Sequence, residues 1–455
     1  MEFRDELIDQ TVEQIKELMA NRDYSALRKL FDDLEPADVA QIFTETEEEY
    51  VPVLFRLLSK DMAADCFVEM EPDVQKSLIE ALSDRELQEV VDDLFLDDTV
   101  DIIEEMPANV VRRILSNTNP ETRTLINQLL NYPKDSAGSI MTTEFVELRA
   151  RMTVADAFER IRATGLDKET VYTCYVTDDR RKLIGITTVK DMIISGEDAA
   201  IGDIMVTSIV SANTTMDKEE VAHLLEKYDF LALPVVDNED RLVGIVTVDD
   251  AIDVLKDEDT EDIEIMAAMS PSDKPYLRTS IFEIWKNRIP WLLLLMVSAT
   301  FTSRILMHFE DALAAQAALV AFIPMIMDTG GNAGGQASAT IIRGLSLGDI
   351  EMGDILRVIW KEIRVAFLCG ISLGIVNFFK VIFIDRVAVP VAAAVCVTLA
   401  LAVVIAKIVG STLPILAKRI GFDPAVMASP FITTIVDALA LLVYFRVATL
   451  IFAGM

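Results

Sequence analysis

Histidine and cysteine are scarce in this sequence of 455 residues, and each scarcity excludes a class of protein. The two histidines, His223 and His308, do not form the His-Glu-x-x-His motif of a zinc metalloprotease. The four cysteines are neither closely paired nor spaced as zinc ligands, which favours a reducing cytoplasm. The segment Met1 to Gln10 has no apolar stretch, so we expect no cleavable signal peptide.

Positive charge is scarce in the first 270 residues. They hold 62 aspartates and glutamates against 26 lysines and arginines, whereas the remaining residues hold 12 against 15. An acidic half repels phosphates, which excludes nucleic acid as a partner. The excess of carboxylates favours either plain solubility or the binding of cations.

Long apolar runs are absent before residue 280 and frequent after it. A membrane-spanning helix needs about 20 apolar residues, and we expect five spans, at 287–307, 312–341, 356–384, 388–417 and 425–453. Basic residues such as Lys286, Arg343 and Lys418 flank alternate ends of these spans. The positive-inside rule therefore predicts a multi-pass protein of the cytoplasmic membrane, with the N-terminal half inside and the C-terminus outside.

An internal repeat of about 60 residues fills residues 138–256. Ser139 to Met141 matches Asp203 to Met205, and Leu183 to Asp191 matches Leu242 to Asp250. Each copy reads as strand, helix, two strands and helix. The repeat resembles a tandem pair of CBS domains. Each copy ends with the pattern Gly-x-x-Thr-x-x-Asp, at Gly185 to Asp191 and at Gly244 to Asp250. The resemblance implies an intramolecular regulatory module of α/β fold.

The residues before the repeat have helical periodicity. Short apolar segments are separated by proline, aspartate or serine starts, as at Pro72 and Ser83, which predicts an all-α superhelical domain over residues 1–136. The predicted CBS domains cover 137–200 and 201–256. A charged helix over 257–280 then connects the second of them to a helical membrane domain at 281–455.

The segment Pro324–Gln336 combines glycines with polar side chains inside a predicted span. Glycines allow close backbone approach, and carboxylate and amide oxygens are hard ligands for a cation. Glycines alone are also typical of simple helix packing. That alternative does not explain why Asp328, Asn332 and Gln336 recur at helical spacing.

The last predicted span contains an aspartate, Asp437. Ser429 and Thr433 precede it at intervals of four residues, so the three lie along one helix face. An ionisable group inside a membrane costs at least about 2.5 kcal/mol unless it faces a polar path, so a functional role is the default interpretation. The alternative is a structural salt bridge with an intramembrane base such as Lys407.

Together, the glycine-rich segment, the CBS pair, the acidic linker and the five predicted spans resemble the MgtE family of magnesium channels and transporters. The resemblance implies a homodimer in the lipid bilayer, with a pore between the second and fifth spans where Asp437 holds hydrated Mg²⁺. A carboxylate with neighbouring hydroxyls suits an ion that gives up its water reluctantly. The sequence departs from the family at Ser429, where members can have an asparagine, and at Thr433, where a smaller residue can occur.

The resemblance also gives the acidic residues a regulatory role, because family gating is closed by cytoplasmic Mg²⁺. Facing carboxylates repel one another when cations are scarce and are bridged when cations are plentiful. A solvated surface charge is the alternative for each acid taken alone. The matching acids are Asp97, Asp101, Asp217, Glu219, Asp229, Asp250, Asp253, Glu258, Glu261 and Asp262.

Other functions make different demands on the sequence. A CBS-containing membrane enzyme needs the zinc motif that is missing here, so we expect no enzyme activity. A CBS-regulated anion channel needs more spans and a basic pore. The same residues are also consistent with a transporter of other divalent cations. A CBS cleft also suits ATP or another adenine nucleotide, with Asp191 placed to bind ribose hydroxyls.

Overall fold

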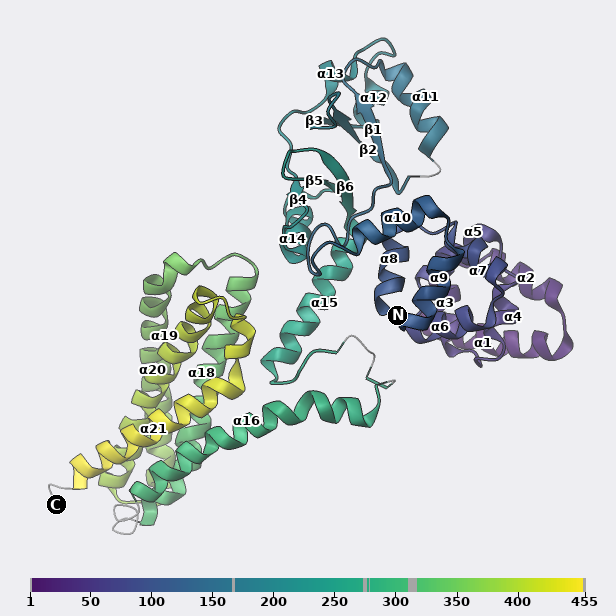
Figure 1. The fold of residues 1–455 in the computed structure, drawn as a ribbon. Coiled ribbons are helices and arrows are strands. Elements are labelled where there is room, and N and C mark those ends of the chain that lie inside the picture. Colours follow the sequence, from purple (N-terminus) through teal and green to yellow (C-terminus); the bar gives the residue numbers. More distant parts are fainter. Residues whose placement is uncertain (1, 166–167, 273–275, 278, 310–316, 453–455) are drawn as a thin grey trace. The chain divides into compact units, whose positions relative to one another are not determined.

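The chain divides into two compact units, Met1–Leu255 and Lys256–Met455, in the computed structural model (Figure 1). The structure describes residues 2–165, 168–272, 276–277, 279–309 and 317–452.

The first unit begins with a succession of short helices, as the sequence predicts. Proline at the first turn of α3, α6 and α10 supports these starts, because its missing N–H has no partner there in any case. Ser83 and Glu86 form a capping box at the start of α7. The helices are α1 (Glu2–Asn21), α2 (Tyr24–Asp32), α3 (Pro36–Glu45), α4 (Val51–Phe55), α5 (Lys60–Val68), α6 (Pro72–Ala81), α7 (Asp84–Val91), α8 (Leu96–Glu105), α9 (Ala108–Asn117) and α10 (Pro120–Leu129).

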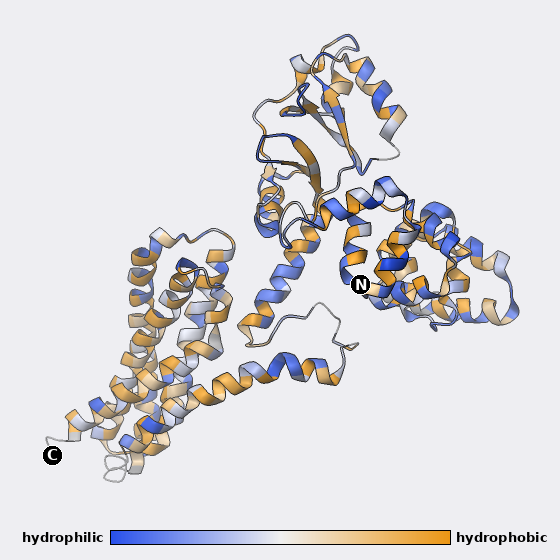
Figure 2. Cartoon of the chain, in the orientation of Figure 1, coloured by the Kyte–Doolittle hydropathy of each residue, from blue (hydrophilic) through white to orange (hydrophobic). Residues whose placement is uncertain are grey.

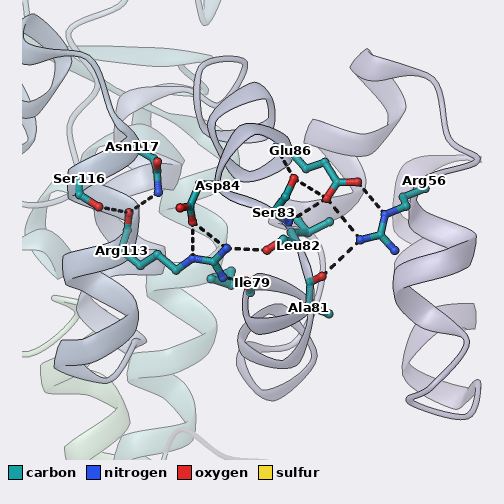
Figure 3. A network of polar contacts seen from close by, with 10 residues as sticks. All are labelled: Arg56, Ile79, Ala81, Leu82, Ser83, Asp84, Glu86, Arg113, Ser116 and Asn117. Atoms are coloured by element: carbon teal, nitrogen blue, oxygen red, sulfur yellow. Dashed lines mark hydrogen bonds and ion pairs between the residues drawn. The ribbon is translucent and has the colours of Figure 1, made fainter.

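Two arginines tie successive turns of this superhelix together (Figure 3). Arg113 donates to the backbone carbonyls of Ile79 and Leu82, and Arg56 donates to the carbonyl of Ala81. The last carbonyls of a helix have no partner within the helix. The guanidinium groups supply the missing donors at the end of α6, and so connect α6 to helices far from it in the sequence.

The repeat predicted from the sequence folds as two similar α/β halves. In each half the first strand pairs in parallel with the second, which pairs antiparallel with the third. The first half comprises β1 (Phe145–Arg149), α11 (Val154–Thr164), β2 (Thr170–Thr177), β3 (Leu183–Thr188), α12 (Val189–Ile194) and α13 (Ile201–Ile204). The second half comprises β4 (Ala212–Asn213), α14 (Lys218–Tyr228), β5 (Ala232–Val236), β6 (Leu242–Thr247) and the start of α15 (Val248–Met266).

The segment that precedes each half in the sequence pairs with a strand of the other half. The residue after Met141 pairs with β6, and the residue after Met205 pairs with β3. A Cβ atom on Gly244 would lie 2.7 Å from the sulfur of Met141, and one on Gly185 would overlap Met205. Only glycine leaves room for these methionines, which explains why glycine and methionine recur together in the repeat.

The helical superhelix shares a hydrophobic core with the second half of the repeat. Leu78 and Ile126 belong to the same buried cluster as Val221 and Val246. The first half has a core of its own, built around buried side chains of β1, β2 and the helices that cover them. The superhelix and the second CBS half are therefore one packed body.

The connecting helix differs from its predicted extent of 257–280. Helix α15 begins at Val248, directly after β6, and ends at Met266. Ala268 has a positive φ of 55°, and the backbone N–H of Ser272 donates to the Glu264 carboxylate at 2.8 Å. Pro271 also disfavours a helical conformation at the residue before it. The prediction of a helix through residues 267–272 is therefore wrong.

The second unit is helical and apolar after α15. Figure 2 shows α19 and α20 largely in the hydrophobic colour. Among the described residues, four helical stretches are long and apolar enough to cross a membrane, namely Ile281–His308, Met352–Phe383, Val389–Arg419 and Pro424–Ile451. The elements are α16 (Ile281–His308), η2 (Ala317–Phe322), α18 (Ile323–Ser346), η3 (Met352–Asp354), α19 (Ile355–Phe383), α20 (Val389–Arg419), η4 (Pro424–Met427) and α21 (Ser429–Phe452).

The prediction of five apolar spans is wrong for the second one, 312–341. Residues 312–316 lie outside the described part, and the helix that follows, α18, is not among the four apolar stretches. Its glycines and polar side chains lower its hydropathy. It packs instead against other helices: Ile326 shares a cluster with Ala440 of α21, and Ala333 shares one with Val403 of α20.

Candidate functional site

The glycines of α18 bring its backbone against two other helices. Gly330, Gly331 and Gly334 are all buried. A Cβ atom on Gly331 would lie 2.7 Å from Cγ2 of Thr433, and one on Gly334 would lie 2.8 Å from Cγ2 of Ile432. Contacts under 3.0 Å force a displacement, so these positions require glycine if α18 and α21 are to meet as they do.

Packing on the glycine side leaves the polar side of α18 uncovered within one chain. Asp328, Asn332 and Gln336 are exposed, while the intervening glycines Gly330, Gly331 and Gly334 are buried. Residues four apart lie on one face of a helix. The three predicted ligands therefore form a single stripe, called here the α18 polar stripe, opposite the packed glycine face.

Asp437 lies two turns into α21 and is partly buried. Its Oδ1 atom is buried and has no hydrogen-bond partner among the described residues. The carboxylate of Asp328, at one end of the α18 polar stripe, is close enough to repel the Asp437 carboxylate. Thr433 lies one turn earlier, and the side chain of Ser429 lies outside the described residues. The structure thus brings Asp437 together with Asp328 and Thr433.

The predicted alternative for Asp437, a salt bridge with Lys407, is wrong. The Lys407 Nζ atom lies 3.5 Å from Oε2 of Glu362 instead. A buried carboxylate oxygen without a donor or a counter-charge is costly unless water or an ion approaches it. The geometry at Asp437 therefore suits a cation ligand.

A second group of carboxylates gathers within the first unit, where α8 and the start of α15 meet the first CBS half. Asp97 and Asp250 were predicted, whereas Asp98, Glu144 and Glu169 were not. Asp97 is 6% exposed, and its Oδ1 and the Oε2 of Glu169 have no hydrogen-bond partner in the described part of the chain. We call these five residues the acid cluster.

Burial and mutual repulsion favour the protonated forms of the acid cluster. Burial, followed by the charge of Asp250, raises the pKa of Asp98 to about 7 and that of Asp97 well above its usual range. Burial and then the charge of Asp98 raise the pKa of Glu169 to about 8. Burial raises the pKa of Asp250 to about 6, although Thr247 donates to its carboxylate at 2.5 Å. A divalent cation would relieve the same repulsion.

The cluster is not arranged as a finished metal site. Among the described residues, no group of three or more histidine, cysteine, aspartate or glutamate side chains is placed to hold a metal ion. The carboxylate of Glu144 already accepts a hydrogen bond, because the backbone N–H of Leu96 donates to it at 3.0 Å. The unpartnered oxygens of Asp97 and Glu169 are the atoms of the cluster that fit a cation.

Two further predicted acids lie on the helices that carry the cluster. Asp101 is exposed on α8, one turn after Asp97, and partial desolvation followed by the charge of Asp250 raises the pKa of its carboxyl. Asp253 is exposed on α15 and follows Asp250 by one turn. Both acids therefore border the cluster and add to its negative charge.

The predicted sensor acids of α14 make local contacts. Asp217 caps the start of α14 by accepting from the backbone N–H of Glu219 at 2.9 Å, and Glu219 lies 3.6 Å from His223. Asp229 lies at the opposite end of the same helix. These three acids do not gather into one group.

The acids at the end of α15 contact the membrane-domain helix α18 within the second unit. Asp262 accepts from the hydroxyl of Ser346 at 3.3 Å, and Asp259, which was not predicted, pairs with Arg343 at 3.1 Å. Hydrophobic side chains at the end of α15 pack nearby against buried residues of α18 and η4. The other two predicted acids of this region lie on the same helix and interact with other residues; they are Glu258 and Glu261.

Asp191 has a local structural role. Its Oδ2 accepts from the hydroxyl of Thr188 at 2.6 Å, and its own N–H donates back to that hydroxyl at 3.1 Å. This capping box begins α12. Thr247 and Asp250 occupy the matching positions of the second half, where the aspartate belongs to the acid cluster.

Comparison with known proteins assigns the chain to a family. The family model MgtE, described as a divalent cation transporter, matches residues 323–447; the MgtE intracellular N domain matches 34–135, and CBS domains match 137–196 and 201–257. The magnesium transporter MgtE of Thermus thermophilus is 37% identical over 442 residues, which cover 96% of this chain and 97% of that protein. This chain belongs to the MgtE family. The MgtE of Bacillus subtilis is 33% identical over 441 residues and covers 97% of each chain.

Solved structures of MgtE proteins resemble the first part of this chain. The cytosolic domain of the Mg²⁺ channel MgtE in complex with ATP is 35% identical, with a TM-score of 0.51. The match covers 53% of this chain and 99% of that structure. The family resemblance and the superhelix and CBS architecture predicted from the sequence are confirmed.

The glycine packing of this MgtE-family chain predicts the effect of one substitution. Gly331→Val places a branched side chain where a Cβ already meets Thr433, so we expect α18 and α21 to separate and Mg²⁺ flux to fall at least about tenfold, equivalent to about 1.4 kcal/mol. Uptake into proteoliposomes measures this. Gly374→Ala in α19 is the control, because its Cβ would lie 3.7 Å from the nearest atom. Equal flux in both variants would reduce the motif to ordinary helix packing.

The acid cluster predicts how stability depends on pH. Its folded-state pKa values are raised above the unfolded values near 4, so the folded state binds protons more tightly. Without Mg²⁺, these groups favour folding at low pH and oppose it as the pH rises from 5 to 8. We expect the free energy of unfolding to fall over this range by at least about 1.4 kcal/mol, the equivalent of one pKa unit.

Calorimetry of the full-length protein in detergent with a chelator tests this dependence. The double variant Asp98→Asn with Glu169→Gln removes two carboxyl groups with raised pKa values, so its melting temperature should change less with pH than that of the wild type. Added Mg²⁺ should flatten the wild-type profile. A double variant with the wild-type slope would show that the dependence arises elsewhere.

Proposed function

We propose that this chain conducts Mg²⁺ across the cytoplasmic membrane and that Mg²⁺ on its cytoplasmic side inhibits the conduction. The proposal rests mainly on Asp437, a carboxylate inside an apolar bundle with a buried oxygen that has no partner among the described residues. Further oxygen atoms on Thr433, one turn earlier, and on Asp328 of the α18 polar stripe, whose charge acts on Asp437, support the proposal. Full-length relatives that are named magnesium transporters support the same function and give no support to an enzyme.

The pathway follows from these groups. Hydrated Mg²⁺ keeps most of its water and binds one or two carboxylates. Asp437 would attract the hydrated ion, and the hydroxyl of Thr433 would contact its water. Asn332 would line the cytoplasmic mouth. Because the α18 polar stripe is uncovered within one chain, we infer that a second copy faces it and that the pore forms between the two chains of a homodimer.

The orientation and the regulatory ligands complete the proposal. The superhelix and CBS pair are cytoplasmic, and the C-terminus is extracytoplasmic, with α18 crossing inside the helical bundle. Mg²⁺ binds at the acid cluster and, separately, at the acids of α15, and favours the closed state because that state binds it more tightly. An adenine nucleotide binds the CBS pair, with Asp191 near its ribose; the ATP-bound structure of a relative supports this class of ligand.

The first test concerns the pathway. Asp437→Asn keeps the shape of the side chain but removes its charge, so we expect Mg²⁺ uptake into proteoliposomes to fall at least about a hundredfold, equivalent to about 2.7 kcal/mol. The control Asp349→Asn removes an exposed acid between α18 and η3 and should retain uptake. Wild-type uptake by the Asp437→Asn protein would refute the pathway. Competing Mn²⁺, Co²⁺ and Ca²⁺ in the same assay distinguish a magnesium channel from a transporter of other divalent cations.

The second test concerns inhibition. Asp250→Asn, Glu258→Gln and Glu261→Gln together should raise the cytoplasmic Mg²⁺ concentration for half-inhibition at least about tenfold, a coupling loss of about 1.4 kcal/mol. Conduction should persist because the carboxylate of the pathway is unchanged. Patch recording from the cytoplasmic side measures both.

A matched triple variant is the control for this test. Glu121→Gln, Asp179→Asn and Glu159→Gln remove the same charge from exposed positions of the first unit. Inhibition by Mg²⁺ should stay at the wild-type level in this control. The same inhibition in both triple variants would leave the predicted sensor acids as surface charge.

A further inference from the structure

Two opposite charges are buried between α19 and α20, away from the residues assigned to the pathway. The side chains of Lys407 and Glu362 are 8% and 14% exposed, and their charged atoms lie 3.5 Å apart. Lys407 lies about 18 Å along the α20 axis from Arg419, at about 1.5 Å per residue. Ionisable residues at such depth are costly and normally functional.

Lys407 belongs to the turn of α20 that touches the glycine face of α18. The carbonyl oxygen of Ala406 would lie 3.3 Å from a Cβ on Gly334, and a Cβ on Gly410 would overlap the Gly334 carbonyl. The residues on both sides of Lys407 are therefore in backbone contact with α18. Gly334 lies two residues after Asn332 of the α18 polar stripe.

The same turn of α20 also packs against α21, the helix that carries Asp437. Ala406 shares a buried cluster with Val436, the residue before Asp437, and Cys369 of α19 packs against this cluster. Rotation of α20 about its axis would therefore disturb α18 and α21 together. The ion pair between Lys407 and Glu362 fixes that rotation. It joins one side of α20 to α19, while another side of α20 packs against α18.

A buried ion pair is a poor device for stability alone. Apolar residues of similar volume in place of such a pair are often neutral or stabilising, because the charges lose their water on burial. The pair does, however, permit fewer arrangements of the two helices than apolar packing does. This difference separates a geometric role from a purely structural one.

We propose that Glu362 and Lys407 are a positioning pair for conduction, which keeps α20 in the rotation that aligns Asn332 of α18 with Asp437 of α21. The inference rests on the proposed transport function. Neither residue contacts the ion: Glu362 is paired with the lysine, whose charge would repel Mg²⁺. The pair acts through the backbone contact between α18 and α20.

The decisive variant replaces both charges at once, Glu362→Leu with Lys407→Met, in the full-length protein. We expect its melting temperature in detergent to equal or exceed that of the wild type, and its Mg²⁺ uptake into proteoliposomes to fall at least about tenfold, as loss of alignment without loss of packing requires. Wild-type uptake overturns the proposal. A parallel loss of uptake and melting temperature also overturns it, because the pair would then be only structural.

The exchanged pair, Glu362→Lys with Lys407→Glu, supplies the rescue. Uptake close to that of the wild type supports positioning by the pair, whereas a stable exchanged protein that does not conduct contradicts it. The control is Asp354→Asn with Arg357→Met, because this pair, at 2.9 Å, joins the last residue of η3 to the first turn of α19 and connects no two spans. If Asp437→Asn loses uptake but the variant without the Glu362–Lys407 charges does not, the proposed function stands and this inference fails. If the wild type itself shows no uptake, the proposed function fails.

Discussion

A carboxylate placed inside an apolar helical bundle must find compensation, and this constraint organises the membrane unit. Two carboxylates of the bundle meet it differently. Glu362 has a buried lysine 3.5 Å away, whereas Asp437 has a buried oxygen without a partner among the described residues. Compensation from within the protein leaves the first carboxylate unavailable as an ion ligand. The second can be compensated only by water or an ion, which makes it the better ligand.

The difference between these two carboxylates depends on the glycines of α18. Because Gly331 and Gly334 admit Thr433, Ile432 and the backbone of α20, the middle of this helix packs closely through positions that have no side chain. The polar residues must then lie on the opposite face. Larger residues at the glycines would push α18 away from α21, and the aspartate of α21 would lose its polar neighbours on α18. Close packing and polar lining are therefore two results of one sequence pattern.

Patterns local in sequence predict much of this structure, whereas pairings between distant elements do not follow from them. The repeat, the glycine-rich segment and Asp437 stand out because their spacing fixes a helix face or a domain copy. Nothing in the sequence near Glu169 links it to Asp97. The partners of Lys407 and Asp259 likewise depend on how helices meet. The prediction of an apolar stretch failed at α18 because the glycines and polar side chains of this helix lower its hydropathy below that of the other four stretches.

Helix α15 connects the two kinds of acid that a cation-dependent gate requires. One continuous helix runs from Val248 to Met266; its first turn carries Asp250 of the acid cluster, and its later turns carry Asp259 and Asp262. The later acids have fixed partners on α18, an arginine and a serine, so their contacts with that helix do not require Mg²⁺. In the acid cluster, by contrast, oxygen atoms of Asp97 and Glu169 have no hydrogen-bond partner among the described residues, and in the proposed gate these atoms are where a cation acts. The fixed contacts thus hold the end of α15 on α18, and in the proposed function it is the acid cluster that would make gating depend on the Mg²⁺ concentration.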